Sequence, residues 1–197
     1  SQTNPINPGS LNNGTGIYFG DWNGDAITDV MWHDNSTGYN WWFVNDGKMN
    51  FTTYANPITP GALNGGTGIY FGDWNGDGIT DVMYHDNVSG GNWWFVNDGN
   101  MNFTTYANPI TPGALNGGTG IYFGDWNSDG ITDVMWYRNS DGYNWWFVND
   151  GNMNFTTYAN PITPGALNGG TGIYFGDWNG DGITDVMYHD NVSGGNW

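Results

Sequence analysis

The sequence lacks cysteine and glutamate, and only Lys48 and Arg138 among its 197 residues are basic. Without cysteine, no disulfide stabilises the fold. The 19 acidic residues are all aspartate and give a formal net charge of −17. Such a chain cannot neutralise a run of phosphates, so we expect no nucleic-acid partner and no binding to an anionic membrane surface. No apolar run approaches the ~18 residues of a membrane span, so we expect no membrane insertion.

Residues that favour helices are scarce as well. Lys, Arg and Gln are nearly missing, whereas the chain holds 34 glycines and many Asn, Asp and Thr residues. Aromatic residues nevertheless make up 18% of the chain, which is enough apolar area for a core and unlike an acidic disordered tail. The composition therefore predicts a folded, turn-rich, all-β protein.

The chain is a tandem repeat with a period of 52 residues, because Gly-Asp-Trp-Asn recurs with its Asp at Asp21, Asp73, Asp125 and Asp177. Between these motifs, Met49–Gly72 reappears unchanged as Met101–Gly124 and Met153–Gly176. We divide the chain into a linker from a preceding repeat at 1–16, repeat 1 at 17–68, repeat 2 at 69–120, repeat 3 at 121–172 and a partial repeat 4 at 173–197.

Each repeat is predicted to form four short antiparallel strands. In the first repeat these are Ile17–Phe19, Ile27–His33, Trp41–Val44 and Met49–Tyr54. The near-continuous apolar run Trp41–Val44 suits a strand buried on both faces, with Trp41 and Trp42 in the core between blades. The prolines of Asn56–Gly61 exclude a helix and a central strand there. Four strands in ~40–50 residues predict a β-propeller-like array of four-stranded blades, with a β-solenoid as the alternative.

An acidic loop follows the first strand of every repeat. Asp21-Trp22-Asn23-Gly24-Asp25-Ala26-Ile27-Thr28-Asp29 places side-chain oxygens at loop positions one, three, five and nine, and the Ile27 carbonyl at position seven. Such an oxygen set suits Ca²⁺ better than Mg²⁺, and three carboxylates ~5 Å apart repel by roughly 3 kcal/mol per pair without a cation. Ordinary Asp/Asn/Gly turns are the alternative, which four copies in phase disfavour. We therefore expect about one Ca²⁺ per repeat. The predicted ligands are Asp21, Asn23, Asp25, Ile27 and Asp29; Asp73, Asn75, Asp77, Ile79 and Asp81; Asp125, Asn127, Asp129, Ile131 and Asp133; and Asp177, Asn179, Asp181, Ile183 and Asp185.

The stretch Ile69–Met83, Ile-Tyr-Phe-Gly-Asp-Trp-Asn-Gly-Asp-Gly-Ile-Thr-Asp-Val-Met, resembles the FG-GAP/VCBS-type repeat. That family includes integrin α-subunit propellers, bacterial extracellular proteins and some bacterial and fungal lectins. The resemblance covers essentially the whole chain and implies a β-propeller with Ca²⁺ between the first two strands of each blade. It also implies sugar pockets at blade edges, as in the lectin members, which close with about seven blades.

The sequence gives little support for a catalytic site. His33, His85 and His189 are each followed by Asp, as a base with its orienting acid would be, but the third repeat has Tyr137-Arg138 there. No Ser or Cys stands in a nucleophile context, and the clustered acids already belong to the predicted metal loops. We predict a protein that is not an enzyme.

Two features relate to carbohydrate. Each acidic loop carries a tryptophan that, if exposed, would stack on a sugar ring, with packing as the alternative: Trp22, Trp74, Trp126 and Trp178. Seven positions fit the N-glycosylation acceptor pattern: Asn13, Asn35, Asn50, Asn87, Asn102, Asn154 and Asn191. Asn50, Asn102 and Asn154 are predicted to share one outward position on the fourth strand.

Two functions remain. The first is an extracellular or cell-surface, calcium-stabilised, lectin-like module that binds carbohydrate in adhesion and gains multivalency from its repeats. The second is a structural subunit, with its acceptor sites N-glycosylated, whose repeats assemble end to end into a ring or into an extracellular filament or surface appendage. The unchanged repeated stretches, which indicate recent duplication, and the periodic acceptor sites favour the filament, whereas the resemblance and the loop tryptophans favour the binding module. We lean towards the binding module.

Overall fold

The computed structural model describes residues 4–64, 68–167 and 172–197. Within these ranges there is no helix, and the strands form three four-stranded sheets and one two-stranded sheet, all antiparallel. Contacts group the sheets into two compact units, the first holding β1–β8 and the second holding β9–β14 together with Trp74–Gly76. The predicted all-β array of four-stranded antiparallel sheets is therefore confirmed.

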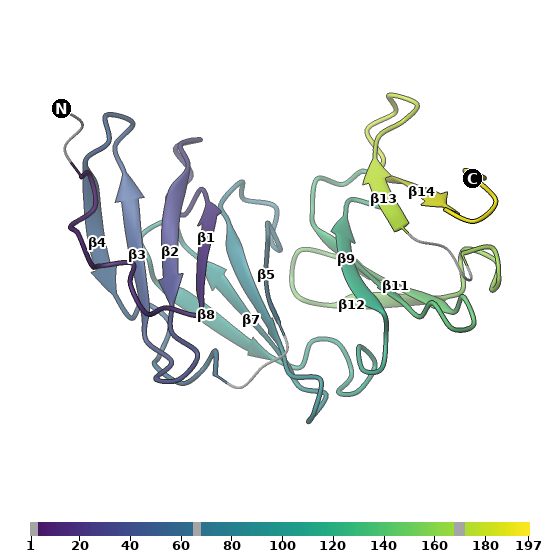
Figure 1. The fold of residues 1–197 in the computed structure, drawn as a ribbon, viewed down its shortest axis with the longest axis horizontal. Helices are drawn as coiled ribbons and strands as arrows, with labels where there is room; N and C mark the ends of the chain where they lie inside the picture. Colours follow the sequence, from purple (N-terminus) through teal and green to yellow (C-terminus); the bar gives the residue numbers. More distant parts are fainter. Residues whose placement is uncertain (1–3, 65–67, 168–171) are drawn as a thin grey trace. The chain divides into compact units, whose positions relative to one another are not determined.

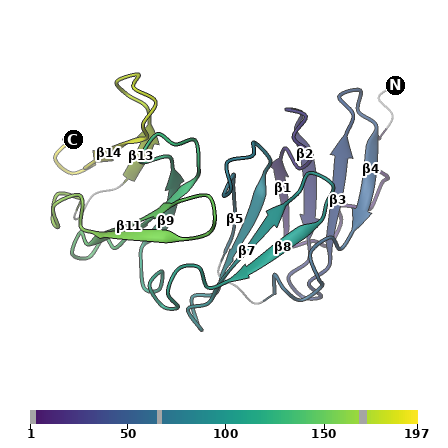
Figure 2. The same ribbon diagram turned by 180° about the vertical axis from the view of Figure 1, so that it is seen from behind.

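The first unit contains two sheets in which consecutive strands pair as neighbours, in the orders β1-β2-β3-β4 and β5-β6-β7-β8. Figures 1 and 2 show the first of these as one twisted layer with β4 at its outer edge. The strands are β1 (Gly16–Gly20), β2 (Asp29–His33), β3 (Asn40–Asn45), β4 (Phe51–Ala55), β5 (Gly68–Gly72), β6 (Asp81–His85), β7 (Asn92–Asn97) and β8 (Phe103–Ala107).

The second unit repeats this arrangement in the order β9-β10-β11-β12 and adds the pair β13-β14. A single bridge between His189 and Asn196 extends that pair. The strands are β9 (Gly120–Gly124), β10 (Asp133–Tyr137), β11 (Asn144–Asn149), β12 (Phe155–Ala159), β13 (Gly172–Gly176) and β14 (Asp185–His189).

The predicted strands are present, but two of them begin later than the apolar pattern suggests. The second strand starts at Asp29, because Ile27 still belongs to the acidic loop, where its N–H donates to Asp25 Oδ1 at 2.8 Å. The fourth strand starts at Phe51, because Met49 has φ +67° and the chain is still turning. Left-handed backbone ends a strand whatever the side chain contributes.

The core of each unit is largely aromatic. In the first unit Met31 of β2 lies opposite Trp42 of β3, and both are fully buried. The buried cluster there comprises Trp22, Met31, Trp42, Ile58, Leu63, Val82, Tyr84, Phe95 and Met101. Its counterpart in the second unit comprises Trp126, Met135, Tyr137, Leu167 and Tyr188. Burying such large side chains supplies the apolar area that a cysteine-free, glycine-rich chain needs.

No helix in the described ranges is long and apolar enough to cross a lipid bilayer.

Candidate functional site

The acidic loop between β1 and β2 is closed by hydrogen bonds to its first aspartate. Asp21 Oδ1 accepts the N–H groups of Gly24 and Asp25 at 2.8 and 3.1 Å, and its Oδ2 accepts that of Ala26 at 2.7 Å. Asn23 Nδ2 donates to Asp25 Oδ2 at 2.9 Å. The first aspartate of the second, third and fourth loops, at Asp73, Asp125 and Asp177, accepts the corresponding N–H groups. The first side chain therefore shapes each loop.

The ninth loop residue has a different environment. Asp29 is fully buried, and its two carboxylate oxygens accept the N–H groups of Asn45 at 2.7 Å and Trp22 at 3.0 Å. Burial raises the pKa of Asp29, an effect that these two N–H groups oppose. In the third repeat burial raises the pKa of Asp133 to about 6, and the charges of Asp129 and Asp125 add to the shift. A desolvated carboxylate beside two others is stabilised by a positive charge.

The donor set of each loop suits Ca²⁺, since it consists of carboxylate, amide and carbonyl oxygens. In the described part of the chain, however, no three acidic or histidine side chains lie close enough together to form a metal site. Loop N–H groups and the adjacent asparagine amide take up the carboxylates of Asp21 and Asp25 instead. The structure thus gives the loop the right ligand chemistry without showing the ligands gathered at one point.

The first and third loops are also tied to the sheet that follows them. Asp21 N–H donates to Thr80 Oγ1 at 3.0 Å, and Thr80 N–H donates back to the Asp21 carbonyl at 2.8 Å. Asn97 Nδ2 donates to the Trp22 carbonyl at 2.7 Å. Asp125 pairs with Thr184 in the same way. The loop therefore joins consecutive repeats as well as consecutive strands.

The expectation that the loop tryptophans stack on sugars is wrong for three of the four. Trp22 and Trp74 are fully buried, and Trp126 is 8% exposed. The Trp22 ring centroid lies 4.5 Å from that of Trp42 and 5.3 Å from that of Phe71 in the next repeat. The indole of Trp22 therefore packs against other aromatic rings of the protein. Trp178 is 59% exposed.

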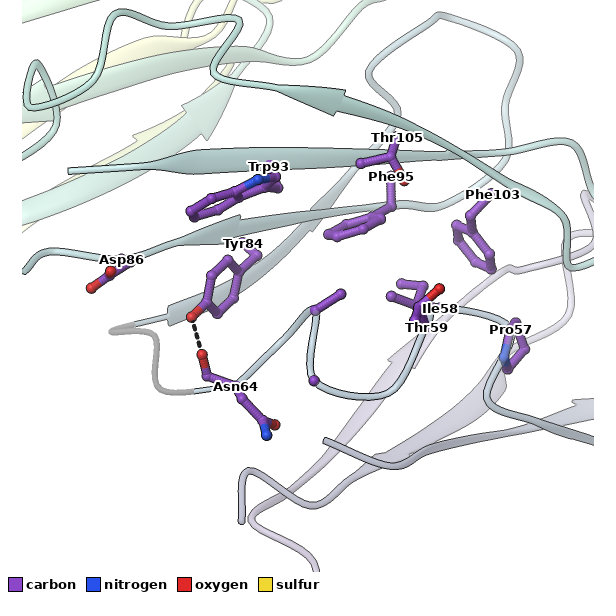
Figure 3. Close-up of a pocket in the computed structure, with 12 residues that line it drawn as sticks. Pro57, Ile58, Thr59, Asn64, Tyr84, Asp86, Trp93, Phe95, Phe103 and Thr105 are labelled. Carbon is purple, nitrogen blue, oxygen red and sulfur yellow. Dashed lines mark hydrogen bonds between the residues drawn. The ribbon is translucent and has the colours of Figure 1, made fainter. Parts of the chain in front are cut away.

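The structure instead places a cavity of about 450 Å³ on one face of the second sheet (Figure 3). Its aromatic wall consists of Tyr84 of β6, Trp93 and Phe95 of β7, and Phe103 of β8. The ring centroids of Tyr84 and Trp93 are 5.5 Å apart. Polar groups of Thr59, Asn64, Asp86 and Thr105 complete the lining. We call this cavity the second-repeat groove.

The opposite wall is the segment Pro57–Asn64, which leaves the first sheet and crosses the second. Asn40 Nδ2 donates to the Ile58 carbonyl at 2.7 Å, and Asn40 Oδ1 accepts the N–H of Ile58 at 3.2 Å. At the far end of the segment Tyr84 O–H donates to the Asn64 carbonyl, as the dashed line in Figure 3 shows. The wall is thus fixed at both ends by buried side chains, which makes the groove a preformed feature of the fold.

The same groove recurs in each repeat with a complete sheet. The first-repeat groove has about 330 Å³ and the third-repeat groove about 380 Å³, within the range of small-molecule sites. Trp41, Trp93 and Trp145 occupy equivalent places in the three grooves. Trp41 is 38% exposed.

The expectation that both Trp41 and Trp42 lie in the core is wrong for Trp41. Successive residues of β3 point to opposite faces, so Trp42 packs inward while Trp41 and Phe43 line the groove. The available signal was the two-residue period of side chains along a strand, which places Trp41 and Trp42 on opposite faces.

The predicted acceptor asparagines lie at accessible positions. Asn13, Asn50, Asn87, Asn102, Asn154 and Asn191 are exposed and Asn35 is partly exposed. Asn50, Asn102 and Asn154 share one site, as predicted, but each precedes the fourth strand of its sheet rather than lying on it. Asn50 Nδ2 donates to Asp46 Oδ2 at 2.7 Å. Glycosylation of these residues stays a prediction.

The His-Asp pairs form no catalytic dyad in the first repeat. His33 is 1% exposed, and burial lowers the pKa of its imidazole. The neighbouring Asp34 accepts hydrogen bonds from the hydroxyls of Ser36 and Thr37, which lower the pKa of this carboxyl to about 2. Asp34 therefore closes the turn between β2 and β3.

Comparison with known proteins adds three findings. The family model described as FG-GAP-like repeat matches residues 21–84, 73–136 and 127–188. A search of curated proteins finds no significant match. Among solved structures, the chain is similar to an Agrocybe aegerita lectin described as recognising non-reducing terminal N-acetylglucosamine, with 19% identity, a TM-score of 0.68, and coverage of 87% of this chain and 45% of that one.

A second solved structure, the exotype rhamnogalacturonan lyase YesX, has 15% identity and a TM-score of 0.48, with coverage of 90% of this chain and 39% of the lyase. The chain therefore spans less than half the length of both proteins. The likeness to the lectin confirms the propeller-like fold. Since the three family matches run in tandem from residue 21 to residue 188, the chain belongs to the FG-GAP-like repeat family.

Proposed function

We propose that this protein is a non-catalytic carbohydrate-binding module that acts outside the cell or at its surface, as a multivalent adhesion module. One observation carries the proposal: the same groove, with an indole on its wall and polar groups around it, occurs in three successive repeats. The structural similarity to the Agrocybe aegerita lectin also supports carbohydrate binding. Equivalent sites on one chain raise the avidity for a ligand that itself repeats, such as a polysaccharide.

The chemistry of the groove suits a pyranose ring. The C–H face of a sugar packs against an aromatic ring, and hydroxyl groups need hydrogen-bond partners when they are taken out of water. Trp93 offers the ring, while Asn64, Asp86 and Thr59 offer donors and acceptors. Among the described residues that line this groove there is no histidine, no serine and no pair of acids that a hydrolase would need, so binding without turnover is the simplest use of these residues.

The test is a glycan array followed by calorimetric titration of the best ligand. We expect Trp93→Ala and Trp145→Ala each to remove one binding site per chain. Trp178→Ala is the matched control, because Trp178 is exposed but lies outside the described grooves. Loss of sites in Trp178→Ala with retention in the groove variants would contradict the proposal and restore stacking on the loop tryptophan. Absence of binding to any glycan would also overturn it.

We also propose that the acidic loops bind Ca²⁺, about one ion per repeat. The support is the all-oxygen donor set and the raised pKa of Asp133, which marks a carboxylate that a cation would stabilise. An ion bound only by the folded state adds about 2.7 kcal/mol of stability at a concentration of 100 times its dissociation constant. EGTA should therefore lower the melting temperature, and Ca²⁺ should restore it. A melting temperature that is the same in both conditions would contradict calcium binding.

End-to-end association is a second candidate, and the ring contact between successive repeats favours it, because a second copy would form the same contact. Phe19 of β1 is 64% exposed, whereas Phe71, its equivalent in β5, packs against Trp22. Trp178 offers a second copy the kind of surface that Trp22 offers Phe71. Sedimentation velocity should then show concentration-dependent oligomers that Phe19→Asp abolishes and Val88→Asp, at a 91% exposed position, does not. A monomer at all concentrations would exclude this function.

A further inference from the structure

The grooves are equivalent in shape but not in charge. The residue that follows the second strand of each sheet is Asp34, Asp86 and Asp190 in repeats 1, 2 and 4, and it is Arg138 in repeat 3. Arg138 is the only arginine of the chain. Asp86 lines the second-repeat groove and Arg138 lines the third-repeat groove. The exchange therefore alters a groove wall.

Arg138 is held firmly in the third-repeat groove. Its Nε and Nη2 donate to Asp141 Oδ1 and Oδ2 at 2.9 and 2.5 Å, a two-pronged pair that fixes the plane of the guanidinium. The guanidinium carbon lies 5.6 Å from the ring centroid of Trp136 and 5.4 Å from that of Tyr143. Tyr143 in turn stacks on Trp145. The cation is thus set among the same aromatic rings that make the groove.

A guanidinium carries five N–H groups, of which the pair with Asp141 uses two. The other three remain on a side chain that lines the groove and is 37% exposed. Their orientation is set in advance, so a ligand oxygen that meets them costs little additional side-chain ordering. Planar, fixed N–H donors are matched best by a carboxylate, whose two oxygens accept in the same plane.

Asp86 gives the second-repeat groove the opposite character. Its oxygens accept the N–H of Val88 at 2.9 Å and the hydroxyl of Ser89 at 2.5 Å, and these hydrogen bonds lower the pKa of the carboxyl. The side chain is therefore ionised at neutral pH and presents acceptors only. A carboxylate on the ligand would be repelled there, whereas a sugar hydroxyl finds an acceptor. The turn keeps a hydrogen bond between the same two positions despite the exchange, because the pair Asp86 and Ser89 is replaced by the pair Arg138 and Asp141.

We propose that the third-repeat groove recognises an acidic sugar, a uronic acid unit whose carboxylate is bound by Arg138, while the second-repeat groove takes neutral sugar units. Trp145 supplies the stacking surface and Arg138 determines the specificity. A chain with both kinds of groove would bind a polysaccharide in which acidic and neutral units occur together. This inference rests on the carbohydrate-binding function proposed above.

The test uses the full chain and paired ligands that differ only in the carboxylate: oligosaccharides of glucuronic, mannuronic and galacturonic acid, and the same oligosaccharides after carboxyl reduction. Trp41→Ala/Trp93→Ala retains the third-repeat groove, and Trp41→Ala/Trp145→Ala retains the second. We expect the first variant to prefer a uronate over its reduced form by about tenfold or more in dissociation constant, and the second to prefer the reduced form.

The charge exchange is the decisive variant. Arg138→Asp/Asp141→Ser installs the pair found in the second repeat and should abolish the uronate preference while neutral sugars still bind. Fluorine NMR of the unmutated chain labelled with fluorotryptophan gives a second readout that needs no groove deletion, since a uronate should shift the Trp145 signal and leave the Trp93 signal in place.

The outcomes separate the two proposals. Neutral sugars bound by both grooves, with no uronate preference in the third, would overturn the acidic specificity and leave the carbohydrate-binding function standing. A uronate preference that survives the charge exchange would overturn the role of Arg138. If no oligosaccharide binds to any groove, both proposals fail together.

Discussion

The acidic loop and the groove differ in how closely their copies agree. The acidic residues of the loop are the same in all four copies, and only Ala26 and Ser128 depart from glycine at the turning positions. The groove keeps its tryptophan but changes its rim, from Asp86 in the second repeat to Arg138 in the third. The loop connects the first two strands of its sheet in every copy, so every copy has the same structural role. The groove faces solvent, where each copy is free to meet a different ligand.

Under the proposed function, the loop contributes stability and the groove contributes recognition. The Asp21 carboxylate accepts N–H groups of its own loop, and the main chain at Asp21 is hydrogen-bonded to Thr80 of the next repeat. The groove, by contrast, leaves part of an indole and several polar groups accessible. Substitutions in the two regions should therefore separate changes in stability from changes in binding.

The largest expected effect on stability comes from replacing a loop tryptophan by alanine, compared with the same change at a groove tryptophan. Trp22→Ala removes a fully buried ring and should cost roughly 3–5 kcal/mol of unfolding free energy. Trp93→Ala removes a partly exposed ring and should cost about 1–2 kcal/mol, because less area leaves the core. Urea unfolding measures both. Equal losses would show that the groove indole is as structural as the loop indole.

The repeat, the strands and the loop were predictable because they are encoded locally. Alternating residues specify a strand, and Gly and Asp specify a turn, whatever lies nearby. The groove was not predictable in this way, since one wall is Pro57–Asn64 crossing the face of the next sheet. Likewise Trp22 is buried by Phe71, 49 residues later, and no pattern around Trp22 shows that contact. Which face of a sheet is covered depends on the path of the chain.

The wall of the groove offers the next test. Asn40 Oδ1 accepts hydrogen bonds from Trp42 Nε1 and the N–H of Ile58, and its Nδ2 donates to the Ile58 carbonyl. Asn40→Ala leaves these buried groups without partners and should cost about 2–4 kcal/mol. It should also weaken ligand binding in the second-repeat groove, because the segment is no longer held.

Asn100→Ala, at an exposed turn position, is the control for this variant and should change neither stability nor binding by a measurable amount. Thermal unfolding and calorimetric titration of both variants provide the comparison. Binding that is unchanged in Asn40→Ala would mean that the wall keeps its position without this side chain.

A smaller effect is expected within the loop itself, at the sixth position. Ala26 has φ +63°, where Gly78, Gly130 and Gly182 have φ of +82°, +82° and +84°. A left-handed alanine is strained by about 1 kcal/mol relative to glycine, so Ala26→Gly should stabilise the protein by about that amount. Gly78→Ala is the mirror experiment, because a methyl group there meets no atom within 4 Å and only the backbone strain is added. Changes of the same sign in the two variants would contradict this explanation.

The smallest effect is a change in pH dependence at a position where the repeats also differ. Burial lowers the pKa of His33 below its ordinary value of 6.5, so the unfolded chain takes up a proton before the folded protein does. The contribution of His33 to the free energy of unfolding is therefore fully present when the pH is above the ordinary pKa of 6.5. It is lost as the pH falls towards the lower pKa of the folded state. The third repeat has Tyr137 at this position, and its O–H donates to the Leu167 carbonyl. A tyrosine does not titrate near neutral pH. His33→Tyr should thus flatten the loss of stability between about pH 7.5 and about pH 5. Urea unfolding across this range measures the slope, and a slope that the substitution leaves unchanged would show that His33 does not titrate on unfolding.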